Sequence, residues 1–461
     1  MKIIKNILKY GLVVIVLLVM AVIFPIFSYK KETNTNPLPS YYKKGVYHVH
    51  SLFSDGRGTV DEIARAAGSL GLDFVILTDH GRPNRKSVKA TAYLNNVLLI
   101  GGSEFSLQSG HLAAAGLKIP GYVFPPEPQE AINEVIHDKG VCFIAHPFDD
   151  RIPWTDWNLR EFTGLEILTC YRSAGGIPVF KLLMFPLQYF LSSNYAVLNT
   201  LKYPQKEIRK WDLLNLDNSG HYSGIYALDA HGRLASGGKF QLNFPSYQAM
   251  FEILNIYVKL DQQLPANAQQ ASSFIISAMR NGNFFSVIEG IASANGFEAY
   301  FVDKTGQRVE MGGSSEVEEG KLVILLPFEF ETDIVVKRDG QVYRKLAGNR
   351  EKKCEIEVKG PGFYGIEVFV SHNKFKYLPW ILANPFYIGL DKRFFGVQGR
   401  FFQKKPLLKE KGFFVVEKNQ GSKGSIVYAK SDKDEWVMTF AFKLDKDESG
   451  EKDFWSVLAA R

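Results

Sequence analysis

Histidines and carboxylates in this chain stand at the ends of short apolar runs. Six of the nine histidines stand at or beside the end of a strand-like run, and they belong to a set of seven: His48, His50, His80, His111, His146, His221 and His231. His48 and His50 are two residues apart, so the alternation of a strand would project both rings to one face, where they could bind one metal ion. A lone His-x-His pair is weak evidence, but the clustering of the other histidines favours a metal site.

The types of these residues indicate which metals the site would take. Neutral imidazole together with carboxylate suits Zn, Mn or Fe, and a carboxylate that bridges two ions holds them about 4 Å apart. Thiolates are not expected to take part. Cys142, Cys170 and Cys354 are odd in number and widely spaced, which predicts packed thiols rather than disulfides or a Cys-x-x-Cys metal site.

Strand-like and helical patterns alternate from Gly45 onward, and they must position these side chains. Thr59 followed by Glu62 predicts a capped helix that ends at Gly71, and a second helix is expected from Pro128 to Lys139. In α/β proteins, active sites gather beyond the carboxyl ends of the strands. The predicted strands, each with a chemically competent residue at one end, are 46–50, 74–80, 98–104, 111–117, 141–146 and 225–231.

Five short segments, spread over about residues 45 to 290, carry a resemblance to a known family. They are His48-Val-His50-Ser-Leu-Phe-Ser-Asp55-Gly, Leu77-Thr-Asp79-His80, Gly102-Ser-Glu104, Ala145-His146-Pro and Asp229-Ala-His231. In order and spacing they resemble the four motifs of the polymerase and histidinol phosphatase (PHP) family. Ala227-Leu228 stands where a Gly-Ser pair often occurs, but the matching ligand positions are all present.

The resemblance implies an α/β fold with a distorted (β/α)7 TIM-like barrel, two or three divalent metal ions, and hydrolysis of phosphate esters by a metal-bound hydroxide. It implies Glu104 as a bridging carboxylate, and catalytic roles for Glu104, Asp229 and Asp55. The metal ligands that it implies are His48, His50, Asp55, His80, Glu104, His111, His146, Asp229 and His231.

Four arginines near the motifs are candidates for contacting substrate phosphate through paired hydrogen bonds, although a surface or structural role is favoured for each. These are Arg82, Arg85, Arg172 and Arg233. His137 falls inside a predicted helix and His372 in the C-terminal region, so neither is expected in the site. His221 lies in a turn before the last motif, and its role is left open.

The N-terminus is apolar from Tyr10 to Tyr29 apart from Gly11, Pro25 and Ser28, and lysines precede it. That length can span a bilayer, so residues 1–31 are predicted to be an uncleaved transmembrane anchor, with the catalytic domain outside the cytoplasm. A cleaved signal peptide is the alternative, but bulky residues follow the apolar run. Residues 32–44 are expected to form a linker.

Three further regions are predicted after the linker. Residues 45–295 form the PHP domain, 296–398 a β-sandwich-like domain with short strands between turn signals, and 399–461 an additional β-rich segment. Within the first, residues 150–225 form a long insertion. Its apolar stretch 177–190 is too short to span a bilayer and predicts a core or lid helix over or beside the metal pocket, or a helix lying at a membrane surface.

Composition sets the functional alternatives. Hydrophobic residues make up 46% of the chain, charged residues 22%, and the net charge of +7 is compatible with a phosphate-bearing substrate, an anionic membrane surface or nucleic acid. The expected function is a membrane-anchored phosphoesterase acting on a phosphorylated small molecule or envelope component, with the bilayer contacted through residues 10–29. A non-catalytic metal-binding envelope protein and a nuclease are the alternatives, and no specific nucleic-acid partner is expected.

Overall fold

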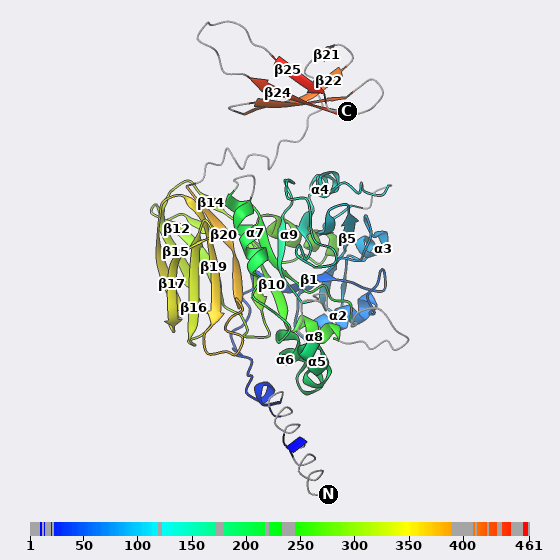
Figure 1. The fold of residues 1–461 in the computed structure, drawn as a ribbon. Coiled ribbons are helices and arrows are strands. Elements are labelled where there is room, and N and C mark those ends of the chain that lie inside the picture. Colours follow the sequence, from blue (N-terminus) through cyan, green and yellow to red (C-terminus); the bar gives the residue numbers. More distant parts are fainter. Residues whose placement is uncertain are drawn as a thin grey trace. The chain divides into compact units, whose positions relative to one another are not determined.

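The computed structural model describes residues 10–11, 13, 20, 23–118, 122–170, 179–216, 221–232, 245–389, 409–410, 413–421, 424–430, 436–443 and 455–459. Arg172, Arg233 and the first two residues of the 177–190 stretch lie outside this set. The chain divides into two compact units, residues 1–395 and 396–461. The larger unit is mixed α/β and contains every predicted site residue (Figure 1).

An 11-stranded sheet runs through the larger unit, in the order β17-β16-β19-β20-β11-β10-β1-β2-β4-β3, with β14 paired to β20. β1 pairs with β2 in parallel and with β10 antiparallel, and β2 pairs with β4 in parallel. The strands from β11 to β3 in this order form one half of the sheet. They are β1 (Tyr42–Val49), β2 (Phe74–Leu77), β3 (Ala92–Leu94), β4 (Val97–Ile100), β10 (Leu254–Lys259) and β11 (Phe284–Ile288).

A second sheet has the order β5-β6-β7-β8-β9. The first three strands are antiparallel neighbours, whereas β7, β8 and β9 are parallel. Its strands are β5 (Gly102–Leu107), β6 (Gly110–Ala115), β7 (Val141–Ile144), β8 (Gly164–Thr169) and β9 (Ser223–Ala227).

The strand predicted over 98–104 is two strands in different sheets, β4 and β5, which separate at Gly101. A Cβ at Gly101 would lie 2.2 Å from the carbonyl oxygen of Ser87, so the chain turns there where only glycine fits. Glu104 is therefore the third residue of a hairpin strand. The prediction that it stands at the end of a parallel strand is wrong.

The two sheets meet through isolated bridges at His80–Glu104 and at Val49–Ala230. They are not joined by continuous pairing, so a closed TIM-like barrel is not confirmed. The coarser prediction of an α/β fold holds. Both bridges involve or adjoin residues predicted to bind metal, which places the meeting point of the sheets at the site.

Helices cover the sheets, and their ends follow local capping chemistry. α2 (Val60–Ser69) begins with the predicted capping box, in which Thr59 accepts from the Glu62 amide and Glu62 accepts from the Thr59 amide. Ile63, Ala64 and Ala67 bury its inner face. The other helices outside the insertion are α3 (Arg85–Lys89), α4 (Pro128–His137), α8 (Tyr247–Phe251) and α9 (Ala268–Arg280).

The insertion after residue 150 contains a strand that the sequence analysis missed, since β8 lies between β7 and β9 and continues the second sheet. Its helices are α5 (Val179–Leu191), α6 (Ser193–Leu198) and α7 (Gln205–Leu216). α5 contacts α6, and α6 contacts α8 (Figure 1). Leu183 and Phe190 of α5 are 67% and 86% exposed, so part of the predicted apolar helix faces solvent.

Strands of the region after residue 296 form a separate four-stranded sheet, β13-β12-β15-β18, and extend the large sheet. β20 pairs with β11, which makes the extension continuous with the part of the sheet that contains β10, β1 and β2. The predicted boundary at 295 stays a prediction. These strands are β12 (Glu298–Asp303), β13 (Arg308–Glu310), β14 (Ser314–Ser315), β15 (Glu319–Leu325), β16 (Thr332–Arg338), β17 (Gln341–Asn349), β18 (Lys353–Lys359), β19 (Gly362–Val370) and β20 (Ile381–Ile388).

The predicted N-terminal anchor is not supported. Among the residues described by the structure, none belongs to a helix with both the length and the apolar character needed to cross a membrane. The predicted linker contacts the folded unit: Glu32 forms a bridge with Ala292, and the Asn36 side chain donates to the Pro327 carbonyl at 2.6 Å. The localisation that rested on the anchor is withdrawn.

The smaller unit contains one antiparallel sheet in the order β21-β22-β23-β24-β25. Its strands are β21 (Lys409–Glu410), β22 (Phe413–Gly421), β23 (Gly424–Lys430), β24 (Trp436–Lys443) and β25 (Trp455–Ala459). None of the predicted site residues lies in this unit.

Candidate metal centre

Four buried donor atoms stand at the corners of a small polyhedron. His48 Nε2 lies 3.1 Å from His50 Nε2, and each of these nitrogens lies 3.2–3.4 Å from Glu104 Oε2 and Asp229 Oδ1. Four ligands around a cation at bond lengths of about 2.0–2.1 Å are separated by about 3.3–3.4 Å in tetrahedral geometry. The two nitrogens therefore have the spacing of a tetrahedral metal site from each other and from both oxygens, and all four donor atoms lie within 4.8 Å of one another.

The two carboxylate oxygens of Glu104 face different groups of histidines. Oε2 belongs to the His48 and His50 group, whereas Oε1 lies 2.9 Å from His111 Nδ1 and 3.1 Å from His146 Nε2. Because one oxygen serves each group, Glu104 has the placement of a carboxylate that bridges two ions. This is the arrangement implied by the family resemblance.

A third group lies nearer to solvent, and it contains His50, Asp55, His80 and His231. Asp55 Oδ2 is 3.2 Å from His231 Nε2, and its other oxygen is 3.5 Å from His50 Nδ1. The side chains of Asp55 and His80 are 38% and 33% exposed, whereas those of His48 and His50 are fully buried. Asp55 and His80 thus form the open side of the centre.

All nine predicted ligands therefore converge, since the structure brings together His48, His50, Asp55, His80, Glu104, His111, His146, Asp229 and His231. Their coordination of metal stays a prediction. The donor set contains imidazole nitrogens and carboxylate oxygens only, and its spacing fits divalent ions of the kind that this mixture prefers.

The backbone at the centre departs from a regular strand. His48, Asp229 and His146 have positive φ values of 67°, 50° and 28°, a conformation that costs non-glycine residues about 1–3 kcal/mol each. The β1–β2 register also shifts between Val46 and Val49. His48 and His50 therefore converge through a strained kink, and not through the simple alternation on which the prediction was based.

Electrostatics couple these groups tightly. Burial alone would lower the pKa of His50, but its hydrogen bonds with Asp229 and Glu104 outweigh burial and raise the pKa to about 9. The same balance with Glu104 raises the pKa of His146 to about 9. Burial would raise the pKa of Glu104, yet the surrounding histidines, His48 first, hold it well below its usual range. Protons on the histidines thus balance the negative charge of the carboxylates, and a bound cation would displace these protons.

Glu166 of β8 is a buried residue that sequence analysis missed. Its Oε1 lies 2.5 Å from His48 Nδ1, and its Oε2 accepts a hydrogen bond of 2.8 Å from the backbone amide of His146. Because the Glu166 carboxylate accepts the Nδ1 proton of His48, the other ring nitrogen, Nε2, faces the donor atoms of His50, Glu104 and Asp229. The signal was present: Glu166 is an acidic residue inside the apolar run Gly-Leu-Glu-Ile-Leu.

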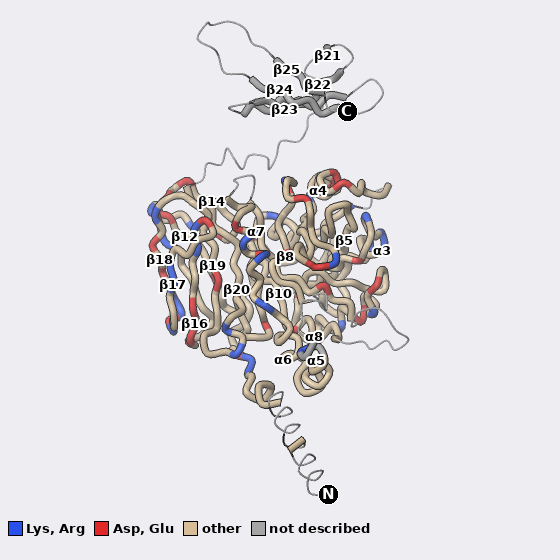
Figure 2. The backbone as a smooth tube through the Cα atoms, in the orientation of Figure 1, with Lys and Arg blue, Asp and Glu red and all other residues tan. Residues whose placement is uncertain are grey.

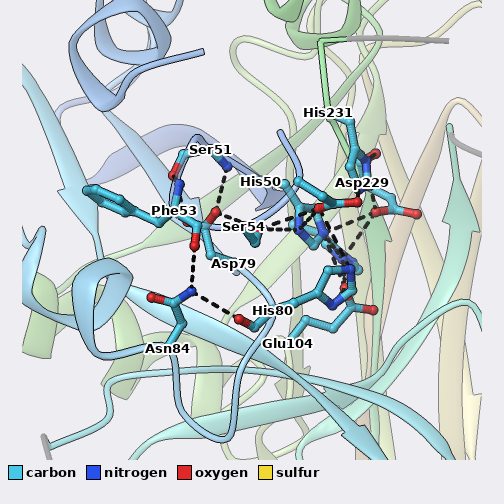
Figure 3. A network of polar contacts seen from close by, with 12 residues as sticks. His50, Ser51, Phe53, Ser54, Asp79, His80, Asn84, Glu104, Asp229 and His231 are labelled. Atoms are coloured by element: carbon cyan, nitrogen blue, oxygen red, sulfur yellow. Dashed lines mark hydrogen bonds and ion pairs between the residues drawn. The ribbon is translucent and has the colours of Figure 1, made fainter. Parts of the chain in front are cut away.

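Asp79 organises the loop that carries Asp55. Its carboxylate accepts hydrogen bonds of 2.8 Å from the Ser51 amide, the Ser51 hydroxyl and the Ser54 hydroxyl (Figure 3). Asn84 ties the same loop to the neighbouring motif by donating to the carbonyls of Phe53 and His80, both at 3.0 Å. Asp79 was recognised as part of a motif, but this supporting role was not predicted.

The arginines and the remaining histidines are the other residues singled out from the sequence. Arg82 is partly buried, and Arg85 is exposed at the start of α3, whereas Arg172 and Arg233 lie outside the described residues. His221 stacks on Tyr387 of β20 with ring centroids 3.5 Å apart, and burial lowers its pKa to about 4. His137 is exposed on α4, and His372 lies 3.1 Å from Glu32, so both stand apart from the centre as predicted.

Neither a protein-family model nor a curated protein matches the sequence. Solved structures do. A two-domain protein from Bacteroides vulgatus, described as containing a predicted PHP-like metal-dependent phosphoesterase, is 14% identical with a TM-score of 0.38, over 78% of this chain and 100% of its own. A protein from Bifidobacterium adolescentis, described as a candidate metal-dependent phosphoesterase, is 13% identical with a TM-score of 0.27, over 49% of this chain and 96% of its own.

An amidohydrolase from Chromobacterium violaceum, solved with bound sulfate and no metal, is 14% identical with a TM-score of 0.26, over 41% of this chain and 87% of its own. The description of the Bacteroides vulgatus protein names the same family that the motifs resemble. At TM-scores below 0.5 these likenesses carry no argument about activity. The inference about chemistry rests on the nine residues and their geometry.

Proposed function

We propose that this chain is a metal-dependent hydrolase of the PHP type that acts on phosphate esters of small molecules. The observation that carries the proposal is the pair of Glu104 oxygens, each within 3.3 Å of a different set of histidines. A centre of adjacent divalent ions suits phosphoryl chemistry, because such ions stabilise the attacking and leaving oxygens of an in-line displacement.

The buried and the exposed residues of the centre would hold different ions. His48, His50, Glu104 and Asp229 would hold one ion, while His111 and His146 would share Glu104 with a second. His231 and Asp55 complete the exposed side. Zn, Mn or Fe would supply positive charge to a phosphoryl group and acidify water when bound.

The groups on the open side of the centre have the protonation states of metal ligands. Burial lowers the pKa of His80, so its imidazole is neutral near pH 7, as binding of an ion requires. Burial would raise the pKa of Asp55, but His231 outweighs it and holds that pKa well below its usual range, so this carboxylate stays ionised. Both side chains are reachable from solvent, which is where a substrate would enter.

We further propose that the two sheets are the halves of the distorted (β/α)7 barrel implied by the resemblance. Support comes from the bridges at His80–Glu104 and Val49–Ala230, because they bring the carboxyl ends of β2 and β1 to the second sheet. Both lie beside the metal centre, where pairing would be interrupted to admit ligands.

The nuclease alternative has less support. Basic and acidic residues are intermixed on β18 (Figure 2), where a nucleic-acid surface would show a basic stripe. Lys345 is 3.4 Å from Asp333 and Lys353 is 2.7 Å from Glu355, so these cations are already paired. A small phosphorylated substrate fits the charge distribution better.

The test is metal analysis of the purified full chain together with hydrolysis assays on a phosphomonoester and phosphodiester panel. We expect at least two divalent ions per chain and ester hydrolysis that a chelator abolishes. Bound ions without hydrolysis of any ester would favour the non-catalytic metal-binding alternative, and a chain that binds no ion would refute the proposal.

A further inference from the structure

One tyrosine hydroxyl joins two of the metal-binding segments. Tyr247, in α8, lies 2.7 Å from the carbonyl oxygen of His50 and 3.1 Å from that of His231. The same oxygen accepts hydrogen bonds of 3.1 Å from the backbone amides of Arg57 and Gly58. It therefore contacts the backbone of two members of the exposed metal group, His50 and His231, and the backbone of the two residues that follow Asp55-Gly, a third member's segment.

The ring of Tyr247 is held in place by glycines on both segments. A Cβ at Gly58 or at Gly232 would lie 2.6 Å from Cε2 of this ring, so neither position leaves room for a side chain. Tyr247 is 8% exposed. At its own N-terminus α8 is fixed by Ser246, whose amide donates to the Tyr189 hydroxyl of α5 at 3.0 Å. The position of the Tyr247 hydroxyl is thus fixed between α8 and the two segments that carry Asp55 and His231.

The two sides of the centre have different supports. Glu166 contacts His48 and the amide of His146, which belong to the buried side. The hydroxyl of Tyr247 contacts the backbone of the segments that carry Asp55 and His231, which belong to the exposed side. His50 lies between them and is shared by both groups.

We infer that Tyr247 is a positioning residue for the exposed metal site, while Glu166 positions the ligands of the buried one. The inference rests on the proposed metal centre. The contacts of the Tyr247 hydroxyl with the metal-binding segments are made to backbone atoms. Tyr247 acts by keeping two loops at the separation at which Asp55 and His231 can bind the same ion. Loss of the Tyr247 hydroxyl would selectively weaken the binding of that ion.

The test is a Co²⁺ titration of the chelator-stripped full chain, followed by visible absorption, for the parent and for Tyr247→Phe. The substitution removes one oxygen and keeps the ring that fills the space beside both glycines. We expect the Co²⁺ of the exposed group to bind 10- to 100-fold more weakly, with the binding of the remaining Co²⁺ unchanged, since loss of such outer contacts costs about that much metal affinity.

Three variants make the result specific. Asp55→Asn marks the absorption bands of the exposed site, and the same bands should weaken in Tyr247→Phe. Glu166→Gln should weaken the other bands. Tyr257→Phe is the control for deleting a buried tyrosine hydroxyl, because Tyr257 hydrogen-bonds Glu289 and Asn295 at 2.9 and 3.0 Å, away from the ligands; it should bind Co²⁺ as the parent does.

Amide exchange in the parent tests the contact without any variant, so a Tyr247→Phe protein that fails to fold does not end the test. The Gly58 amide, which donates to the Tyr247 hydroxyl, should exchange slowly in the metal-free chain, and fast exchange would overturn the inference. Equally weaker binding of every Co²⁺ in Tyr247→Phe, or unchanged binding of every Co²⁺, would also overturn the inference. A parent that binds no Co²⁺ would instead refute the proposed function.

Discussion

Glu104 is the single residue on which the chemistry of the centre depends most. An amide cannot bridge two cations as a carboxylate does, so we expect Glu104→Gln to lower metal occupancy and to slow ester hydrolysis at least about a thousandfold, which corresponds to roughly 4 kcal/mol of lost transition-state stabilisation. The measurement is kcat/KM with metal content determined on the same sample.

His372→Ala is the matched control, because His372 lies by Glu32 and outside the centre; it should keep the parent rate. The circular dichroism spectrum of Glu104→Gln should match the parent, since burial of the surrounding strands is unchanged. A Glu104→Gln chain that hydrolyses esters as fast as the parent, with chelator making no difference, would contradict the metalloenzyme proposal.

At this scale the sequence was most informative. Every predicted ligand converges in the structure, because the motif residues carry their chemistry in their identity and order. Glu166 and Tyr247 were not predicted, for different reasons. Glu166 was visible as a charge inside an apolar run, whereas a tyrosine that holds two loops through backbone atoms leaves no pattern in the sequence.

Among the elements, α7 carries a carboxyl group whose ionisation opposes folding. Burial raises the pKa of Asp212 to about 6, although Lys337 of β16, 4.0 Å away, acts against this shift. The folded state then binds a proton more tightly than the unfolded state, so this group favours folding at low pH and the advantage is lost as pH rises from about 4 to about 6.

We therefore expect Asp212→Asn to gain stability relative to the parent by about 1–3 kcal/mol between pH 4 and pH 7. The measurement is the urea midpoint of each protein across that range. Asp61→Asn, on an exposed face of α2, is the control and should show a smaller difference with pH. A parent and an Asp212→Asn variant with parallel pH curves would show that this carboxyl is ionised in both states.

Helix α5 presents apolar side chains to solvent beside α6 and α8. We expect Leu183→Ser and Phe190→Ser together to leave metal content unchanged, to alter stability by under about 0.5 kcal/mol per site, and to raise KM for esters with apolar groups. Steady-state kinetics on matched polar and apolar esters measure this. Identical KM values for both esters would mean that α5 takes no part in substrate selection.

Elements were predicted less completely than residues. The 98–104 run reads as one strand because its apolar pattern is continuous, yet close packing at Gly101 sends its halves into different sheets. β8 was hidden within an insertion because only its neighbours carry motif residues. Sheet membership depends on contacts distant in sequence, and these have no signature in local periodicity.

In the whole molecule, bound metal would connect the two sheets. His48 belongs to β1 of the large sheet, whereas Glu104 belongs to β5 of the second sheet, and they would share one ion. Each ion held at 100 times its Kd stabilises the folded state by about 2.7 kcal/mol. We expect chelation to lower the melting temperature and to speed amide exchange in β1 and β5.

Exchange in β23 of the smaller unit should not respond to chelation, because that unit holds none of the predicted ligands. Hydrogen exchange with mass spectrometry, with and without chelator, measures both regions in one experiment. Unchanged exchange in β1 and β5 would show that the sheets stay together without metal.

The pairing of β11 with β20 has a practical consequence for anyone who trims this protein. β11 pairs with β10 on one side and with β20 on the other, and every residue of β11 is buried. A fragment that stops at residue 295 would expose its outer backbone as an open, apolar sheet edge, and such edges recruit other chains. Residues 45–295 alone should therefore aggregate on expression, whereas residues 32–389 should stay monodisperse in size-exclusion chromatography.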